Sequence, residues 1–434
     1  IMSQKYDVVC TNPPYMGHRG MNKKLKMKLK NEYRDCDKDF YAVFMKKCFN
    51  YSKQYKYVAM ITMETWMFLS SFKEFRQDII LNKTIINFVH MPYEGKGKTS
   101  LGISFGTSSF VFRNEKIKEY AGRYVYIRYF EIDGEGVPFE FPVKNERLSI
   151  SRAEDFRRIP GGPIAYWVSN SFIRNFERGI SIEKISDFTG SQNKTADNEK
   201  YLRYFWEVNN KKIGCENRWV VYAKGGDFRR HYGNLDIVVD WSKKARIFYE
   251  QNKTSNLLNE KYWYKEGVTY SDLTTRGPNF RYLPKGCLFD MSGPTIIELK
   301  YMNYILALLN SVVMSSYLKF LNPTMHVKVN DVKNLPIIID DKKINYIEEK
   351  ELQNIKISQI DWDSFEKSLN FLKHPVILYK GETKNIKEAF NRWKDFANDQ
   401  FTKLKSNEEE LNRIFIEIYG LQDELTSYVD DKDV

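Results

Sequence analysis

The sequence predicts an α/β fold: an open sheet with helices in the first third of the chain, then a mixed α/β domain and a helical C-terminal segment. Two observations support the first part. Short β-branched and aromatic runs alternate with segments of helical periodicity, and turn residues separate them. A third observation distinguishes the remainder of the chain from this first part. Glycine and proline cluster near residues 134–163, and short aromatic-rich strands then replace the alternation.

Five strands and two helices are predicted in the first part. The run Tyr6–Cys10 is β-branched and ends at a Pro-Pro turn, which predicts a buried strand with a loop at its carboxyl end. Strands alternating with helices imply a mostly parallel sheet, whose ligands bind beyond the carboxyl ends of the strands. The other predicted elements are helices over Asp39–Tyr51 and Phe72–Leu81 and strands over Tyr57–Thr62, Ile85–His90, Ser104–Arg113 and Tyr124–Ile132.

Changes in composition and in hydrophobic periodicity along the chain predict the domain boundaries. Residues 1–135 form the sheet domain, 136–165 a linker, 166–340 a second domain and 341–434 a helical C-terminal region. In the second domain, Arg218–Tyr222 and Lys285–Phe289 are predicted strands, and Met302–Phe320 is predicted to be one apolar core helix. Glu408–Tyr419 is the clearest helix of the last region.

Composition excludes several classes of protein. The chain has 434 residues, of which 42% are hydrophobic and 29% charged, as in a folded globular protein. It contains no apolar run long enough to span a membrane and no signal peptide, so we expect a cytoplasmic protein without membrane contact. Its five cysteines form no C-x-x-C pair and its five histidines are scattered, so we expect neither a disulfide framework nor a metal site.

The net charge suggests a polyanionic partner. The chain carries 68 basic against 56 acidic residues, a net charge of +12. Such a balance suits nucleic acid, and double-stranded DNA is the partner we expect. A basic protein without such a partner is the alternative that charge alone leaves open.

The segment Asn12-Pro13-Pro14-Tyr15 suits the methylation of an exocyclic amine on a base. The lone pair of such an amine is delocalised into the ring, so hydrogen-bond acceptors must draw the nitrogen toward sp³ geometry. The side-chain oxygen of Asn12 and the carbonyl of Pro13 are two such acceptors. The two prolines stiffen the turn, and Tyr15 offers a face on which a flipped-out base can stack. The alternative is a strand-ending turn without chemistry.

Several motifs resemble those of the adenine-specific, Rossmann-like DNA methyltransferases, in particular the phage-exclusion (BREX) methyltransferases of the PglX type and related fused restriction–modification enzymes. Val8–Tyr15 resembles motif IV of these enzymes, and the resemblance continues to the C-terminal region. The other matching stretches are Met21–Lys26, Asp39–Phe44, Thr65–Phe72, Glu410–Phe415 and Ile418–Leu421. The resemblance implies a Rossmann-like methyltransferase sheet followed by a target recognition domain.

The same resemblance implies roles for individual residues. Asn12 and Pro13 would bind the target amine, Pro14 would stiffen the loop, and Tyr15 would stack on the base. Asp39 and Phe40 match a motif near the donor and adenine sites. Thr107–Phe112 resembles a later strand that gives an apolar contact to the flipped base. Phe110 is the residue we expect there, with Phe105 as the rival and a core position as the alternative for both.

The cofactor implied by the resemblance is S-adenosylmethionine. The family's glycine-rich loop for this donor precedes motif IV, and no such loop precedes Asp7 here. Gly95-Lys96-Gly97-Lys98 and Gly17-His18-Arg19-Gly20 are glycine-rich but lack the helix that should follow. We therefore expect a fragment that lacks half of the donor site and is incomplete for catalysis on its own.

Residues 166–340 occupy the place of the target recognition domain. Basic and amide side chains on predicted loops are the candidates for contact with DNA, since arginine reads guanine, asparagine reads adenine and lysine meets phosphate. The best candidate loops are 227–233 and 271–277. Lys23 and Lys24 could clamp the backbone beside the flipped base. For each candidate a solvated surface charge is the alternative. The candidates in the domain are Lys224, Arg229, Arg230, His231, Arg276, Asn279 and Arg281.

Other functions stay open at this point. One alternative is a binding module that only recognises DNA or assembles with a partner, such as another phage-defence protein. The motif around Asn12 also occurs in methyltransferases that act on RNA amines or protein glutamine, although these enzymes are generally compact. No nuclease motif is placed convincingly, and Asn322-Pro323 lacks the second proline and the aromatic residue of an active loop.

Overall fold

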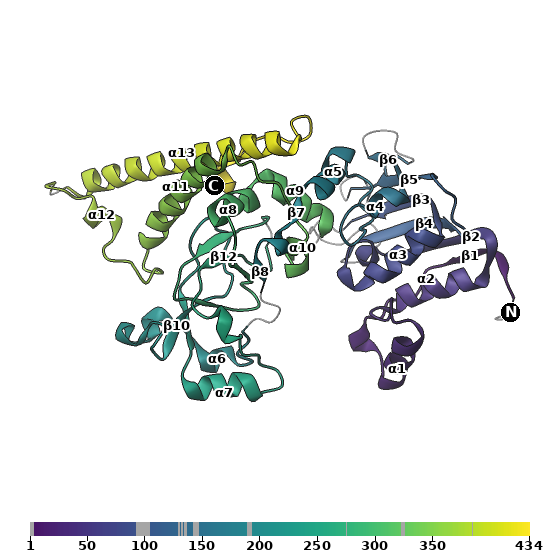
Figure 1. The fold of residues 1–434 in the computed structure, drawn as a ribbon, viewed down its shortest axis with the longest axis horizontal. Helices are drawn as coiled ribbons and strands as arrows, with labels where there is room; N and C mark the ends of the chain where they lie inside the picture. Colours follow the sequence, from purple (N-terminus) through teal and green to yellow (C-terminus); the bar gives the residue numbers. More distant parts are fainter. Residues whose placement is uncertain are drawn as a thin grey trace. The chain divides into compact units, whose positions relative to one another are not determined.

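The computed structural model describes residues 4–92, 105–128, 131, 133, 137–141, 147–188, 193–274, 276–322, 326–383 and 385–434. The predicted glycine-rich stretch 95–98 and Pro323 lie outside these residues. The chain divides into two compact units (Figure 1). Unit 1 comprises Ile1–Glu177 and Phe320–Pro323, and unit 2 comprises Arg178–Lys319 and Thr324–Val434. The division near residue 177 differs from the predicted boundary at 135.

Unit 1 is built around a six-stranded sheet, and the predicted strands and helices are present with shifted ends (Figure 1). Asp39 ends the preceding loop and caps the helix that follows it, as its residue type favours. The elements are β1 (Tyr6–Thr11), α1 (Lys23–Glu32), α2 (Phe40–Tyr51), β2 (Ser52–Met63), α3 (Lys73–Asn82), β3 (Thr84–Met91), β4 (Thr107–Arg113), β5 (Ala121–Tyr126), β6 (Leu148–Arg152), α4 (Ala153–Phe156) and α5 (Asn170–Arg178).

The sheet is mixed, so the prediction of a mostly parallel sheet was wrong. Its order is β1-β2-β4-β3-β5-β6. The pairs β1–β2 and β3–β5 are parallel, whereas β4 pairs antiparallel with both β2 and β3, and β6 antiparallel with β5. Strands β1, β2, β3 and β5 therefore point the same way. Their carboxyl ends, and the start of β4, meet at one edge of the sheet.

Strand β1 is less buried than its apolar sequence predicted. Among the described residues it pairs with β2 alone, and Val8 is 60% exposed. The burial alternation of a half-covered strand appears instead in the second half of β2, where Val58 and Met60 are buried. A β-branched run identifies a strand, but it does not say how many neighbours the strand has.

The core of unit 1 lies on one face of the sheet, under α2, α3 and α4. Buried side chains of the inner strands, such as Phe88 and Phe112, pack there with Tyr41 and Phe75 from the helices. Trp66, fully buried just after β2, contacts Phe75 and three phenylalanines of the sheet. This packing fixes the end of β2 beside the end of β1.

The predicted linker at 136–165 contains part of the sheet domain. Within it, β6 pairs with β5 and α4 contributes to the core. Two of the glycines that suggested a linker, Gly161 and Gly162, form a turn, with φ of +82° and +60°. The buried guanidinium of Arg76 donates to both of their carbonyls, at 2.9 and 3.2 Å. The glycines therefore mark a turn that is held inside unit 1.

Unit 2 contains two four-stranded sheets, ordered β14-β10-β11-β9 and β13-β12-β15-β8, and the pair β16-β7. Aromatic residues dominate its core. The strands are β7 (Ile180–Ser181), β8 (Asp187–Phe188), β9 (Leu202–Tyr204), β10 (Trp219–Ala223), β11 (Ile237–Asp240), β12 (Gly267–Thr269), β13 (Arg281–Leu283), β14 (Leu288–Phe289), β15 (Thr295–Ile297) and β16 (Pro336–Ile337). The helices are α6 (Asn198–Tyr201), α7 (Lys243–Gln251), α8 (Met302–Asn310), α9 (Val312–Leu321), α10 (Val329–Lys333), α11 (Ile344–Asp363), α12 (Pro375–Leu378) and α13 (Ile386–Tyr419).

The apolar segment Met302–Phe320 is two helices rather than the single one predicted. α8 and α9 meet at Ser311 with a bend of 69°. Most of α8 is buried, as expected for a core helix. Among the described residues no single helix is long and apolar enough to cross a membrane, and this bent pair passes that test by length and composition only.

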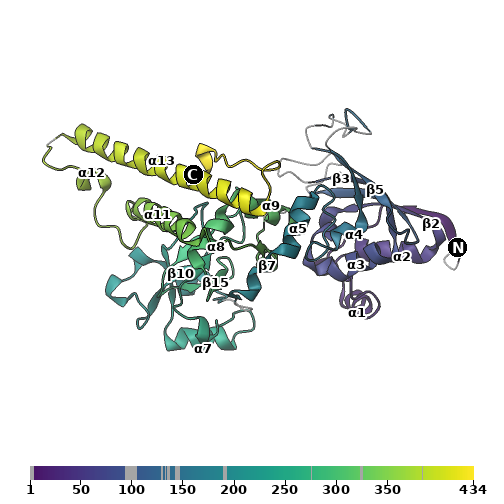
Figure 2. The ribbon, with the colours of Figure 1, turned by 45° about the horizontal axis from the view of Figure 1, so that its top comes forward.

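The helical C-terminal region belongs to unit 2. The 34-residue helix α13 runs beside α11, and α12 packs on α13 (Figures 1 and 2). α11 also packs against α8. The predicted helix over Glu408–Tyr419 is the more buried end of α13, which begins at Ile386 within the region predicted to be helical.

Candidate active site

The loop Asn12-Pro13-Pro14-Tyr15 leaves the carboxyl end of β1, where its sequence predicted it. Pro13 is buried, whereas Asn12 and Pro14 are exposed and Tyr15 is 36% exposed. The amide of Asn12 is therefore held on an anchored turn and still faces solvent. A buried proline leaves no backbone N–H without a partner, which suits this anchoring role.

Tyr15 closes the loop onto the sheet. Its hydroxyl lies 3.1 Å from Oδ1 of Asn12 and 3.4 Å from the carbonyl oxygen of Ile61 on β2. Partial burial raises the pKa of Tyr15, so the hydroxyl stays protonated and donates. In this conformation the oxygen expected to receive a target amine already accepts a hydrogen bond from Tyr15.

Two aromatic rings stand edge-on around Tyr15. The ring centroids of Phe105 and Tyr41 lie 5.5 and 6.1 Å from that of Tyr15, with interplanar angles of 90° and 79°. Tyr41, from α2, is itself fixed by a 2.8 Å hydrogen bond to Thr65 after β2. The three rings form an aromatic corner at the carboxyl edge of the sheet.

Asp39 and Phe40 lie next to this corner. Oδ1 of Asp39 accepts from the amides of Met16 and Tyr41 at 3.2 and 3.4 Å, and the amide of Phe40 donates to the Met16 carbonyl at 3.1 Å. Burial raises the pKa of the Asp39 carboxyl, although these amide bonds oppose the shift. Asp39 thus ties the start of α2 to the active loop.

Of the two phenylalanines proposed to touch the base, Phe110 lies in the core. It is 3% exposed, on β4, with its ring 5.6 Å from Trp66 and 4.8 Å from Phe112. Phe105 lies just before β4 and contacts Tyr15. The geometry therefore favours Phe105 over Phe110 for a base contact.

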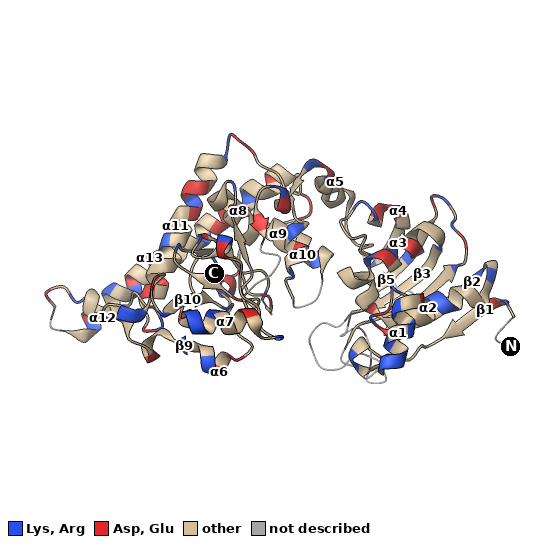
Figure 3. Ribbon diagram, turned by 60° about the horizontal axis from the view of Figure 1, so that its bottom comes forward, with Lys and Arg blue, Asp and Glu red and all other residues tan. Residues whose placement is uncertain are grey.

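Lys23 and Lys24 are exposed in the first turn of α1, which follows the active loop. The side chain of Asn22 caps this helix by accepting from the amide of Leu25 at 2.9 Å. Lysines and arginines are visible on α1 and around α6 and α7 (Figure 3). Lys23 and Lys24 remain candidates for contact with DNA phosphates.

Asn279 and Arg281 of unit 2 are buried, which the sequence did not indicate. They are 2% and 1% exposed. Nη1 of Arg281 donates to the carbonyl and side-chain oxygens of Asn279 and to the carbonyl of Arg229, at 3.0 to 3.2 Å. Burial lowers the pKa of Arg281 to about 9. In this conformation both residues brace the loops and cannot reach DNA.

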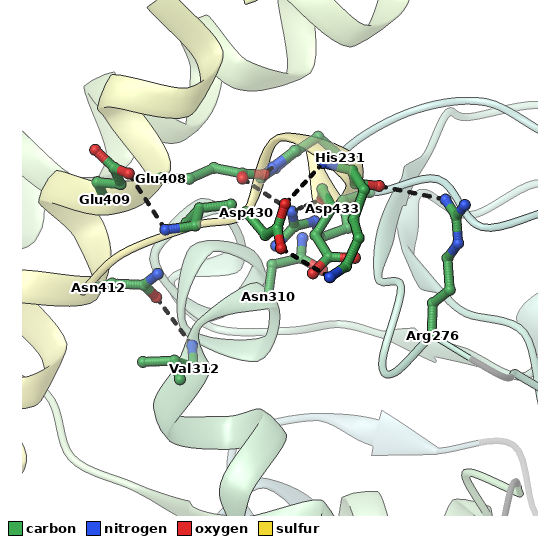
Figure 4. A network of polar contacts seen from close by, with 12 residues as sticks. His231, Arg276, Asn310, Val312, Glu408, Glu409, Asn412, Asp430 and Asp433 are labelled. Carbon is green, nitrogen blue, oxygen red and sulfur yellow. Dashed lines mark hydrogen bonds and ion pairs between the residues drawn. The ribbon is translucent and has the colours of Figure 1, made fainter. Parts of the chain in front are cut away.

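Arg229 and Arg230 hold the helical region to the first candidate loop. Arg229 pairs with Asp361 of α11 at 2.5 Å and stacks over Trp362. Arg230 pairs with Glu408 of α13 at 2.9 Å and donates to the carbonyl of Asp433 (Figure 4). These contacts engage both guanidinium groups inside unit 2.

His231 lies at the centre of the same network. It is 1% exposed, and its Nδ1 lies 2.7 Å from a carboxylate oxygen of Glu351. Its Nε2 lies 2.9 Å from a carboxylate oxygen of Glu408 (Figure 4). Burial alone lowers the pKa of His231, but the two carboxylates outweigh it and raise the pKa to about 9. The histidine is therefore a cationic link between α11 and α13.

Arg276 is the candidate of unit 2 with the most open surroundings. It is exposed, stacks over Phe228 at 5.7 Å and donates weakly to the Lys432 carbonyl at 3.4 Å (Figure 4). These weak contacts leave its guanidinium able to turn toward a polyanion. Lys224 is partly exposed and remains a candidate, but its Nζ lies 3.3 Å from the buried carboxylate of Asp290.

Unit 2 carries an exposed aromatic pair that was not predicted from the sequence. Tyr204 and Trp206 are 47% and 50% exposed, with rings parallel to within 3° and centroids 4.6 Å apart. Tyr204 ends edge strand β9 and Trp206 lies two residues on, followed by the exposed Lys211 and Lys212. The i, i+2 aromatic pattern at a strand end was the available signal.

The described residues contain no group of three or more His, Cys, Asp or Glu side chains that could hold a metal ion. All five cysteines are free.

Comparison with known proteins finds relatives that are described as methyltransferases. A family model described as Eco57I restriction-modification methylase matches residues 1–96. The whole chain is 33% identical to the adenine-specific methyltransferase PglX of Lacticaseibacillus casei (strain Zhang). Over 98% of its length it is 32% identical to the adenine-specific methyltransferase BrxX of Escherichia coli O9:H4 (strain HS). The chain spans 38% and 35% of the lengths of these two relatives.

A solved structure shares the fold. The type IIL restriction-modification enzyme MmeI, solved in complex with DNA, aligns with 97% of this chain and 55% of its own, at a TM-score of 0.57 and 12% identity. The similarity confirms the mixed α/β class with its helical C-terminal region.

Proposed function

Because the chain is a relative, over its whole length, of the PglX-type adenine-specific methyltransferases, we propose that it forms the target-binding part of a site-specific DNA methyltransferase. The enzyme would methylate the N6 amine of a flipped-out adenine, in phage defence or restriction–modification. The observation that carries this proposal is the exposed amide of Asn12, placed beside the aromatic corner at the carboxyl edge of the sheet.

The amine would bind between two acceptors. One is Oδ1 of Asn12, once the Tyr15 hydroxyl has left it, and the other is the carbonyl of Pro13. Both acceptors gain strength as the nitrogen becomes positive, so they stabilise the transition state more than the bound base. Tyr15 would stack on the base, and Phe105 would meet it edge-on.

S-adenosylmethionine would supply the electrophilic methyl group when bound. Of the residues described, Asp39 and Phe40 lie where the family resemblance puts part of the donor site. Oδ1 of Asp39 already accepts two amides, and Phe40 packs on Phe44 at 5.0 Å. The residues present thus fit a bound adenine well and fit S-adenosylmethionine only in part. We therefore propose no further role for them in binding S-adenosylmethionine.

Unit 2 would read the DNA. Arg276 and Lys224, with the exposed residues Tyr204, Lys211 and Lys212, are the side chains we propose for this contact, since exposed cations meet phosphates and arginine reads base edges. Lys23 and Lys24 would meet phosphates beside the target base. Arg229, Arg230, Asn279 and Arg281 are left out of the proposed contact set because they are engaged or buried inside the unit.

Substitutions of Tyr15 test the stacking role. In the full-length enzyme, Tyr15→Ala should lower kcat/KM for methylation by roughly 10- to 100-fold, the value of one base–aromatic stack. Tyr15→Phe keeps the ring and removes only the hydroxyl, so it should stay within about threefold of wild type. Methyl incorporation into duplex DNA measures both. A Phe variant as impaired as the Ala variant would show that the hydroxyl, rather than the ring, is what the reaction needs.

A second candidate is a binding module without activity of its own, which the partial fit to the donor favours. Calorimetry on this 434-residue chain separates the two ideas. We expect no micromolar binding of S-adenosylmethionine, because the described residues supply few donor contacts. Micromolar affinity would show that the donor pocket lies within these residues and that the chain can act alone.

A further inference from the structure

The two candidate DNA loops of unit 2, 227–233 and 271–277, are joined to each other inside the unit. His231, in the first loop, forms a backbone bridge with Arg281, which follows the second loop. Hydrogen bonds of 2.9 and 2.8 Å connect the backbone of His231 to the two chain neighbours of Arg281. This pairing places the side chain of Arg281 beside both loops.

The guanidinium of Arg281 binds acceptors from both loops. Its Nη1 donates to the carbonyl of Arg229 in the first loop at 3.2 Å, and its Nη2 donates to the hydroxyl of Ser271, where the second loop begins, at 3.3 Å. Nη1 also donates to the carbonyl and side-chain oxygens of Asn279 at 3.0 and 3.1 Å. One buried side chain therefore cross-links the two loops.

Ser271 extends this cross-link. It is 3% exposed, and its amide donates to Oδ1 of Asn279 at 3.0 Å. Its hydroxyl accepts from Arg281 and donates to the carbonyl of Gly226 at 3.3 Å. Gly226 directly precedes the first loop. A chain of hydrogen bonds thus runs from Arg281 through Ser271 to the start of the first loop.

The burial of a charge at Arg281 is costly. The residue is 1% exposed, its Nε has no hydrogen-bond partner among the described residues, and the like charge of Arg229 acts against it. The acceptors named above are all neutral oxygens. A hydrophobic side chain of similar volume would avoid this cost. What arginine supplies instead is a planar fork of donors that holds several acceptors in one geometry.

The geometry of the two loops in turn positions Arg276, the arginine proposed to read a base edge. Its guanidinium belongs to the second loop and rests over the ring of Phe228 in the first loop, at 5.7 Å. The same ring lies 5.8 Å from the guanidinium of Arg230. A shift of one loop against the other would therefore move Arg276 off its support. Bidentate contact with guanine depends on the placement of both donors, so such a shift would weaken it.

We propose that Arg281 is a positioning residue for target recognition, which sets the point where Arg276 meets DNA by cross-linking the two loops. This inference rests on the proposed function. Because Arg281 is buried, it acts through the loops and does not touch DNA. Loss of the cross-link should spare the phosphate contacts of the protein and weaken its discrimination between sequences.

Two substitutions in the full-length enzyme break the cross-link in different ways. Arg281→Lys keeps the charge and loses the fork, and Ser271→Ala removes the hydroxyl that Arg281 binds. Base-resolution sequencing of modified DNA from cells carrying each variant gives the outcome. We expect the methylated sequence to become degenerate at one position, with methylation at the other bases there rising about tenfold, as when one base contact is lost. The controls Arg157→Lys and Ser292→Ala, at exposed positions, should leave the methylated sequence unchanged.

Binding of duplex DNA separates positioning from folding. A duplex with the wild-type methylated sequence is compared with one of equal length in which that sequence is scrambled. We expect the ratio of the two affinities to fall about tenfold, while affinity for the scrambled duplex stays within about twofold. Ser271→Ala, the smaller change, decides the test if the lysine variant does not fold.

Two results would overturn the proposal. One is a methylated sequence that neither variant changes, and the other is an equal loss of affinity for both duplexes, which indicates damage to the fold. The wild-type enzyme tests the proposed function separately. Wild-type cells without N6-methyladenine would contradict the proposed function itself, whereas a wild-type pattern that both variants retain would contradict only the role of Arg281.

Discussion

Replacing Asn12 by alanine should lower kcat for methylation about 10²- to 10³-fold in the full-length enzyme. The substitution removes one of the two acceptors that stabilise the developing charge, and such groups contribute about 2.7–4 kcal/mol. Because Asn12 is exposed and its side chain bonds to Tyr15, which is itself exposed, the fold should be unchanged. Affinity for duplex DNA should stay within about twofold. Methyl transfer and filter binding on the same preparation measure the two quantities.

Two further variants sharpen the Asn12 test. Asn12→Asp keeps an acceptor oxygen and should retain more activity than the alanine variant. Asn31→Ala, at an exposed position of the following helix, should behave as wild type. A kcat of the Asn12→Ala enzyme within tenfold of the wild-type value would show that Asn12 is not an acceptor for the target amine.

Removing His231 should have the largest effect on stability. His231→Ala would leave the buried carboxylate of Glu351 without its cation and leave Glu408 with Arg230 as its remaining partner. Breaking a buried pair in this way costs about 3–5 kcal/mol of unfolding free energy. Chemical denaturation of the chain measures the loss. His18→Ala, at an exposed position of unit 1, is the control and should leave the unfolding midpoint unchanged.

The same histidine predicts a dependence of stability on pH. Its pKa is about 9 in the folded state, above the unfolded value of about 6.5. The stabilisation is therefore fully present below about pH 6.5 and is lost as pH rises through about 9. Burial also raises the pKa of Glu351, so Glu351 and His231 compete for one proton. We assign this proton to His231 because its imidazole faces two carboxylates. A His231→Gln variant with the same pH slope as wild type would contradict this assignment.

The active loop could be predicted because its information is local. A β-branched run fixes β1, two prolines fix the turn, and Asp39 stands where a helix cap belongs. The sheet order could not be predicted. The sequence of Thr107–Arg113 alone does not show that this strand inserts antiparallel between β2 and β3, because the pairing depends on residues 16 to 56 positions earlier in the chain.

The basic residues of unit 2 show where sequence reasoning fails. Arg230 and His231 looked like loop cations, but their partner Glu408 lies 178 and 177 positions away. Arg281 looked exposed, whereas it is buried against Asn279 and the carbonyl of Arg229. The sequence alone does not show whether a charged residue faces solvent or pairs with a residue of a distant helix.

Base-resolution sequencing of modified DNA tests the central claim most directly. DNA from cells carrying the intact gene is compared with DNA from cells in which Asn12 is replaced by alanine. The account predicts N6-methyladenine at one recurring sequence in the first sample and its loss in the second. Methylation of cytosine instead, or an N6-methyladenine pattern that persists without Asn12, would contradict it.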